Sequence, residues 1–242
     1  MHILAIEASN PGAGAAQGPA GSGPGVAIGV MCATGVGALG VEPVRESVRG
    51  GQDDDLMPAI DRLFRRLGVD PRAGVLGRVA VSVGPGGYTS VRVACAVGKM
   101  IAEACGARCV GVPSASVALE SLHEDERSGT VAVALAGKHD SAWVQVFVGG
   151  AARGAGRLMT AADVPVLVGA GVGLLVADRF LSAPMRSAAQ SVGVVIREPR
   201  FDVLACLRLG ALLPAFDPVE LVPIYPREPD AVTLWRIKKM AG

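Results

Sequence analysis

The sequence has no excess of charge of either sign. Its 242 residues include 23 lysines and arginines and 22 aspartates and glutamates, which gives a formal net charge of +1. A protein that grips nucleic acid unaided presents a strongly basic surface. The balanced charge therefore argues against a protein that binds nucleic acid by itself.

Cysteines and long apolar runs are also scarce. The five cysteines are odd in number and show no C-x-x-C spacing, which favours buried, reduced thiols over a disulfide framework or a metal site. No uninterrupted apolar run reaches the roughly 18 residues that a transmembrane helix needs. The first residues lack the charged and apolar segments of a signal peptide. We therefore expect a cytoplasmic protein with no membrane partner.

Aromatic residues make up only 4 % of the chain, whereas half of all residues are apolar. An aliphatic core of this size suits one large domain or two small ones. Three predicted strands, at residues 2–7, 26–31 and 37–44, form a meander before the first helix. Short apolar runs then alternate with helical runs, which predicts an α/β fold.

A glycine-rich stretch, Gly84–Arg92, separates a predicted strand from a predicted helix. The run before it, Val79–Val83, is short and rich in valine, as in a buried strand. The run after it, Val93–Ala104, is rich in alanine and predicts a helix capped by Thr89 or Ser90. Glycine and proline allow a sharp turn and close backbone approach. Such a turn can hold an anion or be purely structural, and both interpretations stay open.

An amphipathic helix is predicted at residues 56–67, where apolar residues recur at helical spacing opposite arginines. The acidic run Asp53–Asp55 comes just before it. Acidic residues at a helix start suit the helix dipole. Three carboxylates could also form a Mg²⁺ site, so this run has two interpretations.

Two further strands are predicted at Thr130–Leu135 and Ala142–Val148. His139 lies beside Asp140 in the turn between them. Because the sequence places no nucleophile next to this pair, a solvated turn is favoured over acid–base catalysis. After a capping Ser114, a helix is predicted up to Leu122.

A second glycine-rich segment, Gly169–Gly173, follows the apolar run Val164–Val168. That run predicts a buried strand, and Leu174–Leu181 predicts the helix after the turn. The glycine spacing is similar to a dinucleotide-binding loop, but the surrounding βαβ unit and the downstream acid are missing. Near the end of the chain, helices are predicted at 203–213 and 231–240.

Four segments together resemble the TsaB (YeaZ) family of tRNA threonylcarbamoyladenosine biosynthesis proteins. They are the first strand Ile3–Ala8, the glycine stretch Ser82–Ala94, the joint Gly111–Ser114 and the tail Pro223–Arg227. The glycine stretch is the most specific of the four. The resemblance implies an actin-like ATPase (ASKHA, RNase H-like) fold with two tandem lobes. It places the first lobe at 1–104 together with 217–242, and the second lobe at 105–216.

The chain departs from the family pattern at several places, among them the end of the first strand and a hairpin of the second lobe. Glu7 stands where the family has an aspartate at the end of the first strand. The hairpin at residues 136–143 has lost both of the family's acidic residues and keeps one basic and one aromatic residue. These differences indicate a divergent member.

The resemblance implies a non-catalytic scaffold subunit, which docks on and activates a TsaD-like transferase that modifies the adenosine next to the anticodon of tRNA. ATP and a metal ion are then expected on the TsaD-like partner, with no cofactor and no metal site in this chain. A TsaE-like ATPase is a further implied partner, a homodimer is implied when the chain is alone, and tRNA is contacted only through the complex. The H-x-x-x-H pair of TsaD-like proteins is missing, since His2, His123 and His139 are the only histidines.

No catalytic residue is assigned. Docking is expected through the first-lobe helices, and a bulky residue at Ala94 or Ala102 is expected to disturb assembly more than folding. The interface candidates are Leu56, Ile60, Leu63, Phe64, Ala94, Val97 and Ile101. The alternative is an actin-like-fold small-molecule kinase or ATPase with phosphate on the glycine turn and a metal on Glu7. The residues expected near such a nucleotide are Glu7 at the end of the first strand and, in the turn, Gly84, Pro85, Gly86, Tyr88, Thr89 and Arg92.

Overall fold

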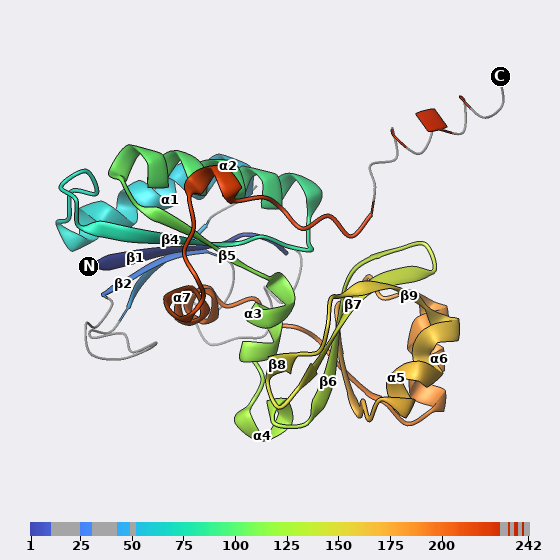
Figure 1. Cartoon of the computed structure of the whole chain (residues 1–242). Helices are drawn as coiled ribbons and strands as arrows, with labels where there is room; N and C mark the ends of the chain where they lie inside the picture. The colour runs from blue at the N-terminus through green and yellow to red at the C-terminus, as the bar shows by residue number, and fades with distance from the viewer. Residues whose placement is uncertain are drawn as a thin grey trace.

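The computed structural model describes residues 1–10, 25–30, 43–48 and 52–227, together with positions 232, 235, 236 and 239. Two lobes, each built on its own mixed sheet, lie one beside the other (Figure 1). The predicted α/β class is confirmed. Among the described helices, none combines the length and hydropathy required of a membrane span.

The first sheet has the strand order β3-β2-β1-β4-β5. β1, β2 and β3 form an antiparallel three-stranded meander, as predicted, but β3 begins at Val44, where the strand predicted at 37–44 ends. β4 and β5 run parallel to β1. The strands are β1 (His2–Glu7), β2 (Gly25–Val30), β3 (Val44–Ser47), β4 (Leu76–Ser82) and β5 (Arg108–Val112).

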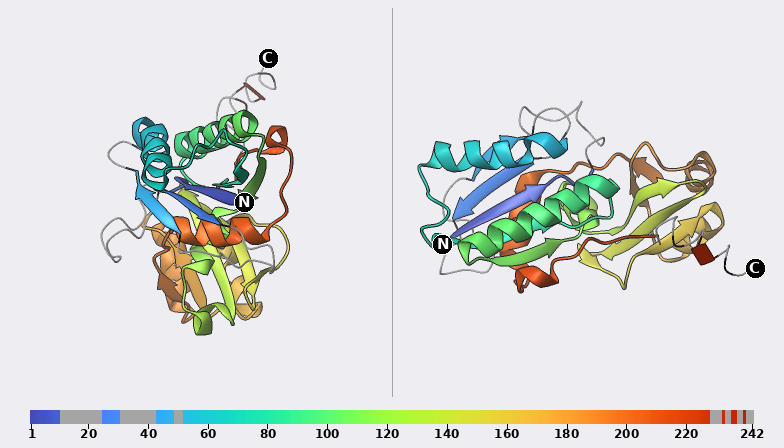
Figure 2. Two further views of the ribbon diagram at one scale, coloured as in Figure 1. Left: turned by 90° about the vertical axis from the view of Figure 1, so that its left-hand side faces the viewer. Right: turned by 90° about the horizontal axis from the view of Figure 1, so that it is seen from above.

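Helices cover both faces of the first sheet, with α1 (Gln52–Leu67) and α2 (Tyr88–Cys105) on one face and α7 (Val203–Leu212) on the other (Figure 2). The alternation of side chains along β1 explains this sandwich. Leu4 and Ile6 pack into the cluster under α1 and α2, whereas Ile3 and Ala5 belong to the cluster that includes α7. A parallel centre covered on both faces accounts for the continuous apolar run of β1.

The second sheet repeats the arrangement of the first. Its order is β11-β10-β6-β7-β8, and β9 also pairs with β7. β6, β7 and β9 are antiparallel neighbours, and β10 and β11 run parallel to β6. The strands are β6 (Thr130–Lys138), β7 (Ser141–Val148), β8 (Ala151–Ala152), β9 (Arg157–Thr160), β10 (Leu174–Ala177) and β11 (Val195–Arg197). This duplication is the actin-like architecture that the family resemblance implied.

One apolar cluster joins the two lobes. It contains Ala5 of the first sheet, Val133 of the second sheet, Ala115 of α3 (Ser114–Glu120) and Cys206 of α7. Both helices lie between the sheets in Figure 1. The outer face of the second sheet is covered by α5 (Val164–Gly169) and α6 (Ala183–Ser191). The remaining short helices are α4 (Glu124–Arg127), η1 (Ala161–Asp163) and η2 (Pro218–Glu220).

Sheet membership differs from the lobe boundary that the sequence suggested. β5 pairs with β4 in the first sheet, and α7 packs against β1 and β4. Both elements lie within 105–216, the range assigned to the second lobe. The parallel ladder to β4 and the apolar face of α7 place them with the first sheet.

Two element types were wrong in the second lobe. Val164–Val168 is helical rather than a strand, and the helix predicted after it begins with the strand β10, Leu174–Ala177. A short apolar run has no period that separates a buried strand from a helix segment. The decisive features are the proline at the start of α5 and the parallel pairing of β10 with β6.

Several sequence predictions lie outside the described residues. Most of the strand predicted at 37–44 and most of the final helix predicted at 231–240 belong to this group. Of the acidic run Asp53–Asp55, only the side chain of Asp55 is described. The Asp55 carboxylate forms an ion pair with Arg62 at 2.9 Å.

Close packing of α7 on the first sheet gives a test of this architecture. A Cβ added at Gly210 would overlap the Cβ of Ala80. We expect Gly210→Ala to lower the free energy of unfolding by about 1–3 kcal/mol because the helix must move away from β4. Urea denaturation measures this change. Gly169→Ala is the control, because an added Cβ there meets no atom within 4 Å; equal effects of the two substitutions would contradict the packing.

Candidate functional site at the glycine turn

The glycine turn joins β4 to α2 at the carboxyl end of the parallel strands, where ligands commonly bind in open α/β sheets. α2 begins at Tyr88, and Gly87 is its N-cap without a side-chain hydrogen bond. The capping role predicted for Thr89 or Ser90 is therefore wrong. The helix begins earlier than the apolar pattern suggested, so both hydroxyl residues lie inside its first turn.

Three distant segments hold this turn by backbone hydrogen bonds. The Gly87 amide donates to the Ser9 carbonyl at 2.7 Å, and the Ser114 amide donates to the Gly84 carbonyl at 2.9 Å. The Ile224 amide donates to Val83 at 2.7 Å. The turn thus connects β1, α3 and the C-terminal tail.

Glycine is required at two positions of the turn. A Cβ at Gly86 would overlap the carbonyl group of Ser9, and Gly84 has a left-handed φ of 95°. These positions show the close backbone approach that the sequence predicted. The Gly87 amide, which could serve an anion, is instead used by Ser9. The described geometry supports a structural turn over a phosphate cradle.

Glu7 lies at the end of β1 and has no exposed surface. Its Oε1 accepts hydrogen bonds from the Ser9 amide at 2.8 Å and the Ser9 hydroxyl at 2.7 Å, whereas Oε2 has no partner. Burial raises the pKa of Glu7, and the bonds from Ser9 oppose this shift. A buried carboxyl with one free oxygen is favoured in its neutral form.

This burial bears on metal and phosphate chemistry. Glu7 has no accessible surface with which to meet a metal ion in this structure. Within the described part of the chain, no three histidine, cysteine, aspartate or glutamate side chains gather as metal ligands would. The carboxyl that the kinase alternative needs as a metal ligand is therefore packed into the fold, whereas Tyr88, Thr89 and Arg92 of the turn are exposed.

A cavity of about 550 Å³ opens beside the turn, between the two lobes. Tyr88 and Tyr225 line it with their ring centres 5.5 Å apart. The guanidinium of Arg92 lies 5.1 Å from the Tyr88 ring centre, a cation–π contact. Tyr88, which was predicted near a nucleotide, thus faces an interlobe cavity rather than Glu7.

Arg227 ties the C-terminal tail to the hairpin of the second lobe. It donates to the carbonyls of Ala136 at 2.6 Å and Ser141 at 2.9 Å, and to the Ser141 hydroxyl at 2.8 Å. Burial lowers the pKa of the Arg227 guanidinium.

Two residues of this hairpin, Ala136 and His139, adopt a left-handed φ, of 52° and 55° respectively. His139 is exposed at the hairpin tip, as the solvated-turn interpretation predicted.

The sequence and the fold of this chain are both similar to those of known proteins. A family model described as TsaD, tRNA N6-adenosine threonylcarbamoyltransferase, matches residues 51–162. A solved structure titled YeaZ from Pseudomonas aeruginosa covers 93 % of this chain and is itself covered to 99 %, with a TM-score of 0.65 and 14 % identity. The chain therefore has the fold of the YeaZ structure. The fold that the sequence resemblance implied is thereby confirmed.

A second Pseudomonas aeruginosa structure, described as similar to the peptidase YeaZ, gives the same result. It covers 93 % of the chain and is covered to 99 %, with a TM-score of 0.64 and 16 % identity. No curated protein sequence matches significantly.

The interface candidates of this YeaZ-like protein are mostly in its own core. Six of the seven are buried, with at most 8 % of their surface exposed, and Val97 alone is partly exposed. The buried six are Leu56, Ile60, Leu63, Phe64, Ala94 and Ile101. Ala94 and Ala102 have no exposed surface either. A bulky residue at Ala94 or Ala102 is therefore expected to weaken folding itself, contrary to the expectation from sequence.

A different set of residues faces outward on the same helices. Met100 of α2 is 52 % exposed, Ala96 and Ala104 lie exposed along the same helix, and Met57 of α1 is 43 % exposed. The spacing 96, 100, 104 repeats every four residues and so follows one side of a helix. Sequence reasoning missed this set because the inward face of each helix is more apolar and attracted the assignment.

The buried carboxyl gives a pH-dependent prediction. Between pH 4.5, near which Glu7 of the unfolded chain titrates, and its raised folded pKa, the folded state binds more protons than the unfolded state. Stability should therefore fall as pH rises through this window. Glu7→Gln should flatten the fall, as measured by urea unfolding at a series of pH values. Parallel profiles for both proteins would show that Glu7 is not the group responsible.

The Arg227 contacts give a second prediction. Arg227→Ala leaves two carbonyls and a hydroxyl without their donor, so we expect a loss of about 1–3 kcal/mol in the free energy of unfolding. Arg65, whose exposed side chain pairs with Asp61 at 3.0 Å, is the control and should cost at most about 0.5 kcal/mol as alanine. Chemical denaturation of the parent protein and the two variants measures these changes. If Arg227→Ala lowers the free energy of unfolding no more than the Arg65 variant does, the Arg227 hydrogen bonds do not stabilise the fold.

Proposed function

We propose that this chain is the non-catalytic scaffold subunit of a TsaD-like tRNA threonylcarbamoyltransferase, docking through the outward face of α1 and α2. The single observation that carries the proposal is the apolar face of α2 that its own sheet leaves uncovered, with Met100 at its centre. The YeaZ-like fold and the family-model match to residues 51–162 support the choice of partner.

The face has the composition of a helix-packing surface. Ala96 and Ala104 have small side chains that allow a partner helix to approach closely, and Met100 supplies a flexible apolar side chain between them. Val93 and Val97, both partly exposed, border the same strip. Exposed apolar surface of this kind is typical of a protein–protein interface.

The assignments for the complex follow from this role. ATP and a metal ion belong to the TsaD-like subunit, tRNA is contacted only through the complex, and a TsaE-like ATPase joins it in the cytoplasm. Without a partner, the same face would pair with a second copy of the chain. The kinase or ATPase alternative draws no support from Glu7, because that carboxyl is fully buried.

A charged residue in the face tests the proposal. Met100→Asp would place a charge in an apolar contact, so we expect at least a tenfold loss of affinity for the TsaD-like subunit, about 1.4 kcal/mol. Co-purification and light scattering establish the complex, and calorimetry measures the affinity. Unfolding in urea should change little because the side chain is half exposed.

Val192→Asp is the matched control, since Val192 is an exposed apolar residue of the second lobe, next to α6. A complex that tolerates Met100→Asp, or loses equal affinity with both variants, would place docking elsewhere. Absence of any complex, together with ATP hydrolysis abolished by Glu7→Gln, would favour the kinase-like enzyme instead.

A further inference from the structure

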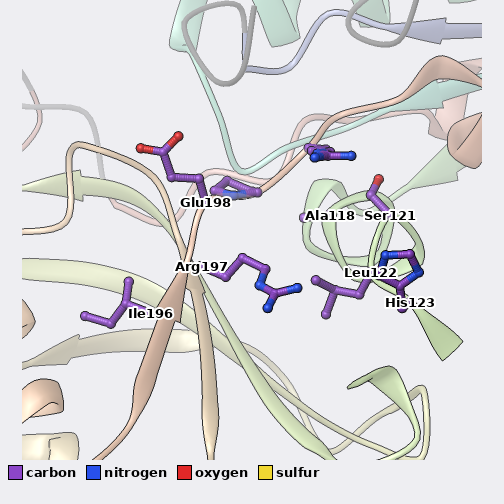
Figure 3. A pocket seen from close by; sticks show the side chains of 9 residues that line it. Ala118, Ser121, Leu122, His123, Ile196, Arg197 and Glu198 are labelled. Carbon is purple, nitrogen blue, oxygen red and sulfur yellow. The ribbon is translucent and has the colours of Figure 1, made fainter. Parts of the chain in front are cut away.

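A second cavity, of about 500 Å³, lies where the chain passes between the lobes (Figure 3). Two segments make this passage in the described chain: residues 113–129, from β5 to β6, and residues 198–202, from β11 to α7. Residues of both segments line the cavity, together with the last two residues of β11. Its polar lining includes His123 from the first segment, Arg197 at the end of β11, and Glu198 and Arg200 from the second segment. We call it the hinge pocket.

The fold holds Arg200 at the mouth of this pocket. Pro199 and Phe201 on either side of it are buried, and Phe201 belongs to the cluster shared by both lobes. In an extended segment, successive side chains point to opposite sides. Arg200 is therefore turned outward by its anchored neighbours. It makes no hydrogen bond or ion pair with any residue that the structure describes.

The other charged groups leave the pocket open to an anion. Arg197 pairs with Glu126 through one nitrogen, and a guanidinium has five N–H donors, so donors remain. In Figure 3 the Arg197 side chain is directed toward Leu122 and His123, whereas the Glu198 carboxylate points away from them. The lining thus offers two guanidinium groups and an imidazole, with its single carboxylate turned aside.

Apart from Ser121, whose hydroxyl donates to the Val117 carbonyl at 3.0 Å, the remaining lining is apolar. Ala118, Leu122, Ile196 and Pro199 provide surface against which the body of a small molecule can pack. A volume of this size is within the range of small-molecule sites. Guanidinium groups match the geometry of phosphate oxygens and bind them with charge-assisted hydrogen bonds.

We propose that the hinge pocket binds a small phosphate-bearing molecule, with Arg200 and Arg197 on the phosphate and the apolar lining on the rest. The half-enclosed shape and the apolar lining favour a small organic phosphate over the backbone of a nucleic acid. Because both interlobe segments line the pocket, an occupant contacts both at once. Binding therefore restrains the movement of one lobe against the other. This site is independent of the docking face on α1 and α2.

Calorimetric titration of the isolated full chain at constant ionic strength tests the proposal, with pyrophosphate and ADP as probes. We expect saturable binding at one site, weakened at least tenfold by Arg200→Ala. Hydrogen exchange at residues 118–123 and 198–202 should slow when the probe is bound, since both segments contact it. Arg200 is exposed, so the variant should unfold at the same urea concentration as the parent protein.

Arg153→Ala is the control, because Arg153 is an exposed arginine elsewhere in the second lobe. Equal weakening by both substitutions would show general surface charge and overturn the proposal. So would the absence of saturable binding by either probe, or binding that survives Arg200→Ala. Arg200-dependent binding of a short RNA oligonucleotide, without binding of the probes, would assign the pocket to nucleic-acid backbone instead. None of these outcomes bears on whether a TsaD-like subunit binds α2.

Discussion

The contact between the turn after β1 and the turn after β4 is the constraint on which the first lobe depends. Gly86 lies against the Ser9 carbonyl so closely that no side chain fits, and the Gly87 amide donates to that carbonyl. Glu7 is enclosed in the same junction and held by Ser9. In an α/β sheet this end of the strands is where ligands usually bind. Here it is filled by the protein's own backbone, and the start of α2 is fixed by that packing.

The first-lobe helices that follow this junction leave their outer sides uncovered by the sheet. Each of these two helices, α1 and α2, has a buried side and an exposed side. Leu63 and Ala94 face the sheet and hold the helices in place, whereas Met57 and Met100 face outward. A rigid pair of helices whose inner sides are fully packed can present its outer side without rearrangement, which lowers the entropic cost of association.

The two lobes are joined more firmly than two separate domains. α3 and α7 share one apolar cluster with both sheets, and Arg227 adds hydrogen bonds from the tail to the second-lobe hairpin. The interlobe segments pass on either side of the hinge pocket, with Phe201 anchored in the shared cluster and Arg200 facing out. The relative position of the lobes therefore depends on a small number of identifiable contacts near the hinge.

The sequence by itself determined the α/β class, the glycine turn, the helix at 56–67 and the helix after the turn, because these segments carry strong local signals: helical spacing of apolar residues or glycines at fixed positions. Only the tertiary structure decided that Val164–Val168 is a helix, since a short apolar run has no period of its own. It also decided which side of α2 is free, because an apolar side chain fits a protein's own core and a partner's surface equally well. The tertiary structure likewise decided the burial of Glu7, which binds Ser9, the residue against which Gly86 packs from a distant part of the sequence.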